Sequence, residues 1–337
     1  MKPKSLIHFV KPRKAFWRQC AERFQRVFDF TNRNMLLQLS LSLLVVLFHF
    51  SVFMTPTFNR IELIFLDTFI KYRQPVEESP AVAYIEIAED SLHAIEQRPW
   101  PRHLDGVLVH ILHEIGARAV VFDFIYEGET TEFDDAAFSE AIERSNFVYL
   151  PIFLETIGSE RVLVQSLSDF QSKVKGTGHV NINADQDGIL RRVKPFVKYG
   201  DTWIPHLGLQ MAYDFLEKPT PHPKNVNVPL DGDGYFLINW ANGWVEAFEH
   251  YSYIDILKSF EAQSKGEKPT VDLKKLQGKI CLVGFTAAGG TDIKSIPIES
   301  AYPGVGILAN IVNQFVVDKF IRPAPKWVNG FLMILLG

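Results

Sequence analysis

The chain has only two cysteines among its 337 residues, Cys20 and Cys281, and it has no internal repeat or low-complexity tract. A disulfide-stabilised scaffold needs several cysteine pairs, so that class is excluded, and a domain of this length buries enough surface without them. Hydrophobic residues make up 47% of the chain and charged residues 22%, which excludes a disordered protein. The composition therefore indicates a packed, globular chain.

The sequence also lacks the common catalytic patterns. His103, His110 and His113 share one predicted helix, but the His-Glu-x-x-His spacing of a zinc protease is missing. Candidate serines lack the sequence of a nucleophile elbow, and no Cys/His or carboxylate pair stands out. We therefore predict no catalytic residue, no metal ligand and no cofactor in this region.

Charged residues are missing from one long stretch, Met35 to Met54. About 20 apolar residues are needed for a helix to cross the hydrocarbon core of a bilayer, so the length fits a membrane span. A buried core helix and a signal peptide are the alternatives. A signal peptide has an apolar region of only about 7–15 residues and a small-residue cleavage site, which this stretch does not offer. The pattern predicts an uncleaved transmembrane helix over residues 35–54.

Basic residues are concentrated before this stretch. Residues 1–34 hold 9 of the 35 Lys and Arg residues but only 2 of the 39 Asp and Glu residues, so the remaining chain carries a net charge of −11. A basic flank favours the cytoplasmic side, and aromatic residues among the basic ones suit contact with anionic lipid. An acidic body is a poor polyanion binder, so nucleic acid is not an expected partner.

These patterns predict the domain organisation. Residues 1–34 form a basic cytoplasmic leader, and residues 55–326 form a domain outside the cytoplasm. Residues 327–337 are apolar again and are expected to begin a second, truncated span. The expected location is the bacterial inner membrane, with the domain in the periplasm, and the lipid bilayer is an expected partner. Cys20 and Cys281 would then lie on opposite sides of the bilayer.

Between the apolar segments, strand-like and helix-like patterns alternate. Residues 57–72 keep helical spacing and extend the first span, whereas residues 219–234 read as a loop. Alternation of this kind predicts an α/β fold with a mixed, mostly parallel central sheet flanked by helices. Strands are predicted over residues 81–88, 118–126, 147–153, 235–240 and 279–285, with two more between 178 and 199, and helices over residues 102–115, 134–145, 203–215 and 303–317.

Two loops after predicted strands hold candidate ligand-binding residues, since ligands of α/β proteins gather at the carboxyl ends of strands. Asp123 ends one strand. It either contributes to a cation or polar-ligand site, or it pairs with Arg102 or caps a turn. Thr286 and Asp292 lie in a glycine-rich loop, which either presents backbone amides to an anion or is a tight structural loop. Trp100 lies between two prolines and reads as a packing residue or a ligand contact.

Several motifs in order resemble the CHASE type-two domain, an extracytoplasmic sensor associated with cyclases and histidine kinases. They include Arg98-Pro-Trp-Pro-Arg-His103, Asp185-Gln-Asp-Gly-Ile-Leu-Arg-Arg-Val193, Gly278-Lys-Ile-Cys-Leu-Val-Gly-Phe-Thr286 and Pro303-Gly-Val-Gly-Ile-Leu-Ala-Asn310. The resemblance covers residues from about 60 to about 320.

The resemblance implies a membrane receptor that regulates a cytoplasmic output enzyme outside these residues. That enzyme is expected to be a class III adenylate or guanylate cyclase, with a histidine kinase, a diguanylate cyclase or a Ser/Thr kinase as alternatives. Nucleotide and Mg²⁺ would belong to that output module alone. We expect a homodimer that responds to an unknown extracytoplasmic ligand or protein. A membrane-tethered periplasmic enzyme and an envelope scaffold protein remain alternatives of other classes.

Overall fold

The computed structural model describes residues 14–53, 56–97, 99–158, 160–287 and 292–322, together with residues 324 and 328. The chain divides into two compact units. The first comprises residues 1–63 and 324–337, and the second comprises Ile64–Pro323. The predicted second span, residues 327–337, lies outside the described residues except for residue 328.

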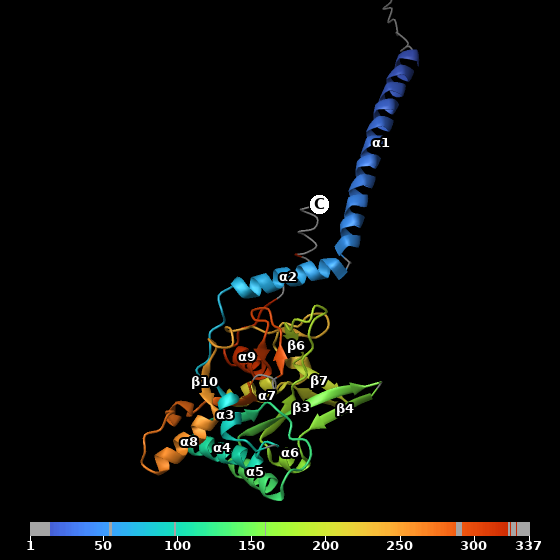
Figure 1. The fold of residues 1–337 in the computed structure, drawn as a ribbon. Helices are drawn as coiled ribbons and strands as arrows, with labels where there is room; N and C mark the ends of the chain where they lie inside the picture. The colour runs from blue at the N-terminus through green and yellow to red at the C-terminus, as the bar shows by residue number, and fades with distance from the viewer. Residues whose placement is uncertain are drawn as a thin grey trace, which may run out of the picture. The chain divides into compact units, whose positions relative to one another are not determined.

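A mixed sheet is the centre of the second unit (Figure 1). Its strands in the described part of the chain are β1 (Val82–Ile87), β2 (Ala119–Phe122), β3 (Val148–Ile157), β4 (Glu160–Gln165), β5 (Gly176–His179), β10 (Glu249–Ser252) and β11 (Ile280–Phe285). The order is β10-β1-β11-β2-β3-β4, and β5 also pairs with β3. Only β3 and β4 are antiparallel neighbours in this sheet. The prediction of a mixed, mostly parallel sheet is therefore confirmed.

One face of the sheet is covered by helices that precede or follow its parallel strands. These are α3 (Glu89–Ala94), α4 (Arg102–Ile115), α5 (Glu132–Ser145), α6 (Ser168–Lys173) and α8 (Tyr253–Ser264), with the 3-10 helix η2 (Leu273–Leu276). Ile85 and Val120 of the strands pack here with Leu108 of α4 and Phe138 of α5. Side chains alternate along a strand, so the neighbouring residue Tyr84 faces the other way.

Two helices cover the opposite face, α7 (Leu207–Phe215) and α9 (Gly304–Val316) (Figure 1). Every residue of α9 from Val305 to Phe315 is buried, which identifies it as an internal helix. Glycine permits the close approach of α9 to β11, because a Cβ at Gly284 would lie 2.7 Å from the Val305 Cβ atom.

A layer of short strands and loops covers the outer side of α7 and α9. It contains β6 (Arg192–Val193), β7 (Phe196–Tyr199), β8 (Thr202–Pro205), β9 (Phe236–Leu237), β12 (Ile293–Lys294) and β13 (Tyr302–Pro303), with the 3-10 helix η1 (Pro223–Asn225). These strands pair antiparallel, as β6 with β9, β7 with β8 and β12 with β13. Phe236 and Trp240 of this layer pack with Ile311 and Phe315 of α9 in a second core.

Buried amide side chains on α9 hold nearby main chain in place. The Asn313 Oδ1 atom accepts a hydrogen bond from the Ser79 backbone N–H at 2.8 Å, and its Nδ2 donates to the Glu77 carbonyl at 3.0 Å. Asn310 and Gln314 accept from the backbone N–H groups of Ala241 and Asn239. Each bond supplies a partner to a main-chain group that has left regular secondary structure.

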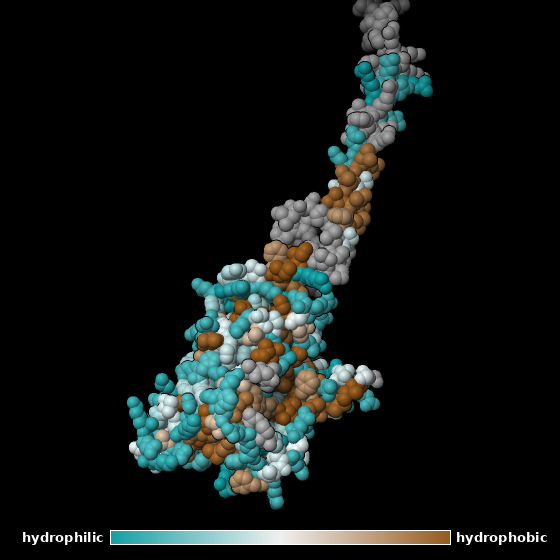
Figure 2. Space-filling model, in the orientation of Figure 1, coloured by the Kyte–Doolittle hydropathy of each residue, from teal (hydrophilic) through white to brown (hydrophobic). Residues whose placement is uncertain are grey.

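Two helices precede the sheet in sequence, α1 (Lys14–Phe53) and α2 (Pro56–Tyr72). Leucines of α1 between Leu36 and Leu47 have exposed side chains (Figure 2). Across the described residues, however, no helix combines the length and apolar character required for a membrane crossing.

Most element predictions agree with the structure. The predicted helix over residues 102–115 coincides with α4, and the predictions around residues 81–88 and 279–285 correspond to β1 and β11. The helix predicted over residues 203–215 is wrong at its start, because Thr202–Pro205 is the strand β8 of a hairpin that turns at Gly200, where φ is +55°. Strand β2 ends at Phe122, short of residue 126, as the chain leaves the sheet at Asp123.

Candidate functional site

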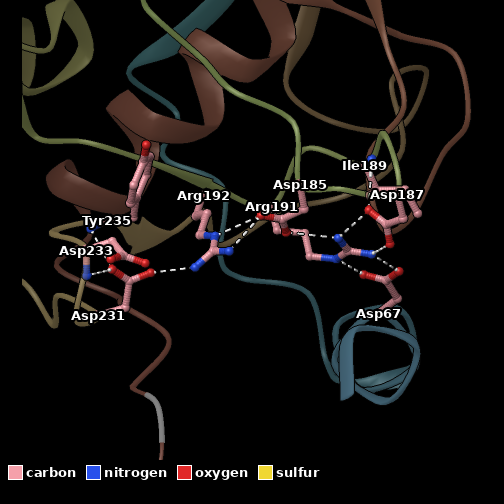
Figure 3. Close-up of polar contacts among 9 residues, drawn as sticks. All are labelled: Asp67, Asp185, Asp187, Ile189, Arg191, Arg192, Asp231, Asp233 and Tyr235. Carbon is pink, nitrogen blue, oxygen red and sulfur yellow. Dashed lines mark hydrogen bonds and ion pairs between the residues drawn. The ribbon is translucent and has the colours of Figure 1, made fainter. Parts of the chain in front are cut away.

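A buried arginine joins α2 to the outer layer of the domain. Arg191 is 1% exposed, and its guanidinium binds the Asp67 carboxylate in a bidentate pair, with Nε–Oδ1 at 2.5 Å and Nη2–Oδ2 at 2.6 Å (Figure 3). The remaining donors reach Asp185 at 2.9 Å and Asp187 at 2.7 Å. Three carboxylates around a guanidinium hold its pKa above the ordinary value against the opposing effect of burial.

Arg192 continues the network on the other side of Asp185. Its Nη1 atom donates to Asp231 at 2.7 Å, and its Nε donates to Asp185 at 2.9 Å (Figure 3). Asp185 therefore bridges both arginines. We call the set Asp67, Asp185, Asp187, Arg191, Arg192 and Asp231 the arginine network.

A tight turn presents two of the four aspartates of the network, Asp185 and Asp187. The Asp185 N–H donates to the Ile189 carbonyl at 2.9 Å, and the Gly188 N–H donates to the Asp185 carbonyl at 2.9 Å. Gly188 has a φ of +84°, a conformation that favours glycine. The turn leads directly to Arg191, so its two carboxylates fold back onto the following arginines.

Residues of α2 on either side of Asp67 also contact the domain. Ile70 is 3% exposed and belongs to the second core, with Leu66 packed against it. Just beyond the helix, the Arg73 side chain donates to the Trp240 carbonyl at 2.9 Å. The part of α2 from Leu66 onward is therefore fixed to the domain by apolar and charged contacts together.

On the α4 face of the sheet, the structure places two predicted site residues, Trp100 and Arg102, in contacts internal to the domain. The Trp100 indole N–H donates to the buried Asp105 carboxylate at 3.2 Å, and Tyr253 and Tyr126 donate to the same carboxylate at 2.8 Å and 3.0 Å. Burial raises the pKa of Asp105 to about 7, although these donors oppose the rise.

Arg102 is buried and pairs with Asp135 at 2.7 Å rather than with Asp123. It also donates to the Gly128 carbonyl at 2.9 Å, and so holds the loop between β2 and α5. The proposed pairing of Arg102 with Asp123 is therefore wrong.

Asp123 and Asp292 line one cavity on the α9 face of the sheet. The cavity has a volume of about 50 Å³, and His206 also lines it. Asp292 forms an ion pair with Lys294 at 2.6 Å, and its carbonyl accepts from the Gly304 N–H at 2.8 Å. Burial, with a smaller contribution from Asp292, raises the pKa of Asp123 to about 7. The sequence pointed to both carboxylates but not to His206.

Thr286, the fifth predicted site residue, directly follows β11. Its backbone N–H donates to the Ile87 carbonyl at 3.1 Å, and its hydroxyl is buried without a hydrogen-bond partner among the described residues. Thr286 does not line the cavity beside Asp123. In the part of the chain that the structure describes, no group of three or more His, Cys, Asp or Glu side chains is arranged to hold a metal ion.

The fold is that of an α/β domain in which helices cover both faces of a mostly parallel sheet. A family model described as the CHASE2 domain matches residues 41–337, so the chain belongs to the CHASE2 family. CHASE2 domains are typically extracytoplasmic sensors of membrane receptors, associated with cyclases and kinases. The comparisons with curated proteins and with solved structures each gave no match.

The arginine network also explains one motif of the resemblance to this family. Asp185-Gln-Asp-Gly and Arg191-Arg192 carried that resemblance, and a turn was expected at Asp185–Gly188, but no ion pair was predicted for these residues. The spacing of opposite charges was the available signal. Their partner Asp67 lies more than a hundred residues earlier, and no local pattern in the sequence connects it to Arg191.

Proposed function

We propose that this chain is the sensing region of a bacterial membrane receptor that regulates a cytoplasmic output enzyme outside these residues. The observation that carries the proposal is the bidentate pair between Asp67 of α2 and the buried Arg191. A sensor must connect its ligand-binding body to the segment that leaves it. The Asp67–Arg191 pair makes such a connection at the N-terminal side of the domain.

The coupling requires two packing states of the domain that differ in how they hold α2. A ligand shifts the population only if it binds one state more tightly than the other. The Arg191 side chain contacts both α2 and the turn at Asp185, so a movement of that turn changes the position of Asp67. In a homodimer, the two α2 helices would move together and bias the output enzymes.

The membrane topology is part of the same proposal. The uncharged stretch from Met35 to Met54 would cross the inner membrane, with the basic residues before it in the cytoplasm and the acidic domain in the periplasm. The lipid bilayer is then a partner of the chain. The output we propose is an adenylate or guanylate cyclase, and its nucleotide and Mg²⁺ would bind only to that module.

Insertion of two glycines after Lys71 in the full-length receptor tests the coupling. The insertion separates the end of α2 from β1 while Asp67 stays paired. A second variant, Asp67→Asn, removes the charge from one partner of Arg191. We expect both variants to bind the partner or ligand as before. The change in cyclic-nucleotide production that binding causes should be at least about tenfold smaller than in the unmodified receptor.

A matched control inserts two glycines after Lys268, in an exposed loop away from α2. Its regulation should equal that of the unmodified receptor. Normal regulation in both α2 variants would rule out a role for α2 in transmission. The receptor could instead produce a cyclic di-nucleotide or phosphorylate a protein. That result would support the sensor role but show that the output enzyme is one of the alternatives and not an adenylate or guanylate cyclase.

A further inference from the structure

A larger cavity than the one beside Asp123 adjoins the arginine network. Its volume is about 460 Å³, and Asp185, Arg192 and Tyr235 contribute to its wall. Clefts of roughly 300–1,000 Å³ accommodate small-molecule ligands in proteins. The cavity beside Asp123, at about 50 Å³, has room for roughly two water molecules. The size of the larger cavity therefore fits a small organic ligand.

Two acidic turns hold the wall of this larger cavity in place. Arg192 lies between them and donates to Asp185 of one turn and to Asp231 of the other (Figure 3). In the second turn, the backbone N–H groups of Asp233 and Tyr235 each donate to the Asp231 Oδ1 atom at 2.9 Å. The backbone of Asp233 and Tyr235 is thus tied to Arg192 without any ligand.

Two cationic side chains lie against the Tyr235 ring. The Arg192 Cζ atom is 5.6 Å and the Lys194 Nζ atom 4.7 Å from the ring centroid. Val193, between them, is 1% exposed and packs in the second core, so alternation along the chain directs both cations to the opposite side. Attraction between a cation and an aromatic ring keeps the Lys194 ammonium group at the wall of the cavity.

The two cations differ in their carboxylate partners. Arg192 pairs with Asp185 and Asp231, whereas the Lys194 ammonium group has no carboxylate partner among the described residues. Asp233 shows the converse, because its carboxylate accepts no hydrogen bond and forms no ion pair in that part of the chain. The cavity therefore presents one cation and one anion that pair neither with each other nor with other described side chains.

This pair of charges discriminates among ligand classes. The formal charge of the wall sums to zero, since Asp185 and Asp233 offset Arg192 and Lys194. A ligand of one sign would be attracted to either Lys194 or Asp233 and repelled by the other. A ligand that carries one group of each sign gains an ion pair at both.

We infer that this cavity binds a small zwitterion of the amino-acid class, with its carboxylate at Lys194 and its ammonium group at Asp233. Asn183 and Gln186 also line the cavity, so polar groups of the ligand meet amides that can donate and accept hydrogen bonds. The inference rests on the proposed sensor function, since it names the ligand class of that sensor.

The arginine network would connect such a ligand to α2. Asp185 accepts from Arg192 in the cavity wall and from Arg191 behind it, and Arg191 holds Asp67 of α2. A ligand that moves Lys194 on the Tyr235 ring changes the packing of Arg192 on the same ring. The position of Asp185, and through Arg191 that of Asp67, then depends on whether the cavity is occupied.

Equilibrium dialysis of the full chain against a mixture of the twenty ¹⁴C-labelled protein amino acids tests the site. We expect saturable binding at one site per chain. The retained amino acid is then compared with two analogues, one without the ammonium group and one with an amide in place of the carboxylate. Each analogue should bind at least about tenfold more weakly, and this comparison needs no variant to fold.

Two variants assign the charges of the ligand to the wall. Lys194→Gln and Asp233→Asn should each weaken binding of the amino acid at least about tenfold. Asp233→Asn should also lose the preference for the amino acid over the analogue without the ammonium group, and Lys194→Gln the preference over the amide. A variant that is merely misfolded would bind all three compounds less and would not lose one preference alone.

Lys198→Gln and Asp201→Asn are the matched controls. Both residues are exposed on the hairpin of β7 and β8, and neither lines the cavity. The two controls make the same changes of charge, so binding of the amino acid should equal that of the unmodified chain.

Three results would overturn the site: no saturable binding of any amino acid, equal binding of the analogues, or unchanged preferences in both variants of the wall. None of them bears on regulation through α2, which is measured on the output enzyme. Saturable binding at Lys194 and Asp233 without any effect on output would confirm the site and contradict the sensor role. The two proposals therefore fail separately.

Discussion

The Arg191 guanidinium lies among three carboxylates and balances part of their charge. Carboxylates of Asp67, Asp185 and Asp187 surround the guanidinium, and the side chain is almost fully buried. Buried ion pairs do not guarantee stability, but removal of one partner leaves uncompensated charge inside the protein. The geometry therefore makes Arg191 indispensable once the aspartates are present.

Arg191→Gln should lower the free energy of unfolding by about 3–5 kcal/mol, because three carboxylates lose their common partner. Arg161→Gln is the matched control, since Arg161 is exposed and donates to the Lys198 carbonyl at 2.9 Å on the surface. That variant should change the value by less than about 0.5 kcal/mol. Urea denaturation followed by tryptophan fluorescence measures both, and equal losses would contradict the role of the network.

His250 makes the stability of the domain depend on pH. Burial lowers the pKa of this imidazole, but the Glu86 carboxylate at 2.6 Å and the carbonyls of Trp244 and Ala247 raise it by more. The folded pKa therefore lies above the unfolded value of about 6.5. The stabilisation is complete below about pH 6.5 and is lost as the pH rises through the folded pKa.

The predicted result is a fall in the free energy of unfolding above about pH 6.5 that is smaller in a His250→Gln variant. Chemical denaturation at several pH values between about 5.5 and 9 compares the two proteins. Buried carboxyls such as Asp105 change the slope equally in both, so the difference between the curves isolates His250. Parallel curves would show that His250 is not protonated in the folded state.

At the scale of elements, glycine sets the distance between β5 and α7. A Cβ atom at Gly178 would lie 2.6 Å from the Leu207 Cα, a backbone atom that cannot rotate away. Gly178→Ala should therefore lower the free energy of unfolding by about 1–3 kcal/mol. Gly232→Ala is the control, because a Cβ atom there would have no neighbour within 4 Å, and it should change the value by less than about 1 kcal/mol. Thermal and urea unfolding distinguish the two, and similar values would contradict close packing of β5 on α7.

The individual helices and strands differ in how well the sequence predicts them. Long periodic segments such as Arg102–Ile115 and continuous apolar runs such as Ile280–Phe285 reveal their own structure, because burial imposes the pattern. The strand β8 was mistaken for part of a helix, since its apolar residues Trp203 and Ile204 lie only a few positions before the apolar start of α7. Short strands in the outer layer depend on pairing with distant segments, as β6 pairs with β9.

Among the residues of the candidate site, some could be predicted from the sequence and others could not. Asp123 and Asp292 were accessible to prediction because each lies in a loop that follows a parallel strand. His206 was not, since its place in the cavity wall depends on how α7 and α9 pack together. Asp67 has no local signal at all, because its partner is 124 positions away.

For the whole molecule, the proposed topology predicts which surfaces meet the periplasm. Burial raises the pKa of the Cys281 thiol to about 12, so this cysteine should not react with maleimide in the folded protein. With Cys20 replaced by serine, Phe133→Cys provides a single reactive thiol on a side chain that is 69% exposed. A membrane-impermeant maleimide should label it in intact spheroplasts.

Labelling of Phe133→Cys only after lysis would place the domain in the cytoplasm and end the topological proposal. A cysteine at Lys4, in the basic leader, provides the reverse control and should react only after lysis. The pair of variants needs no knowledge of the ligand or of the output enzyme.

The most enclosed helix of the domain, α9, is also the last of its described helices in chain order. During synthesis, α9 therefore cannot cover its face of the sheet until residue 316 has left the ribosome, and part of that apolar face stays exposed until then. Ser79 and Glu77, made more than 230 residues earlier, gain their Asn313 partner only at that moment. A chain that ends before Gly304 would lack the helix that covers this face, so we expect proteases to degrade it faster than the domain that includes α9.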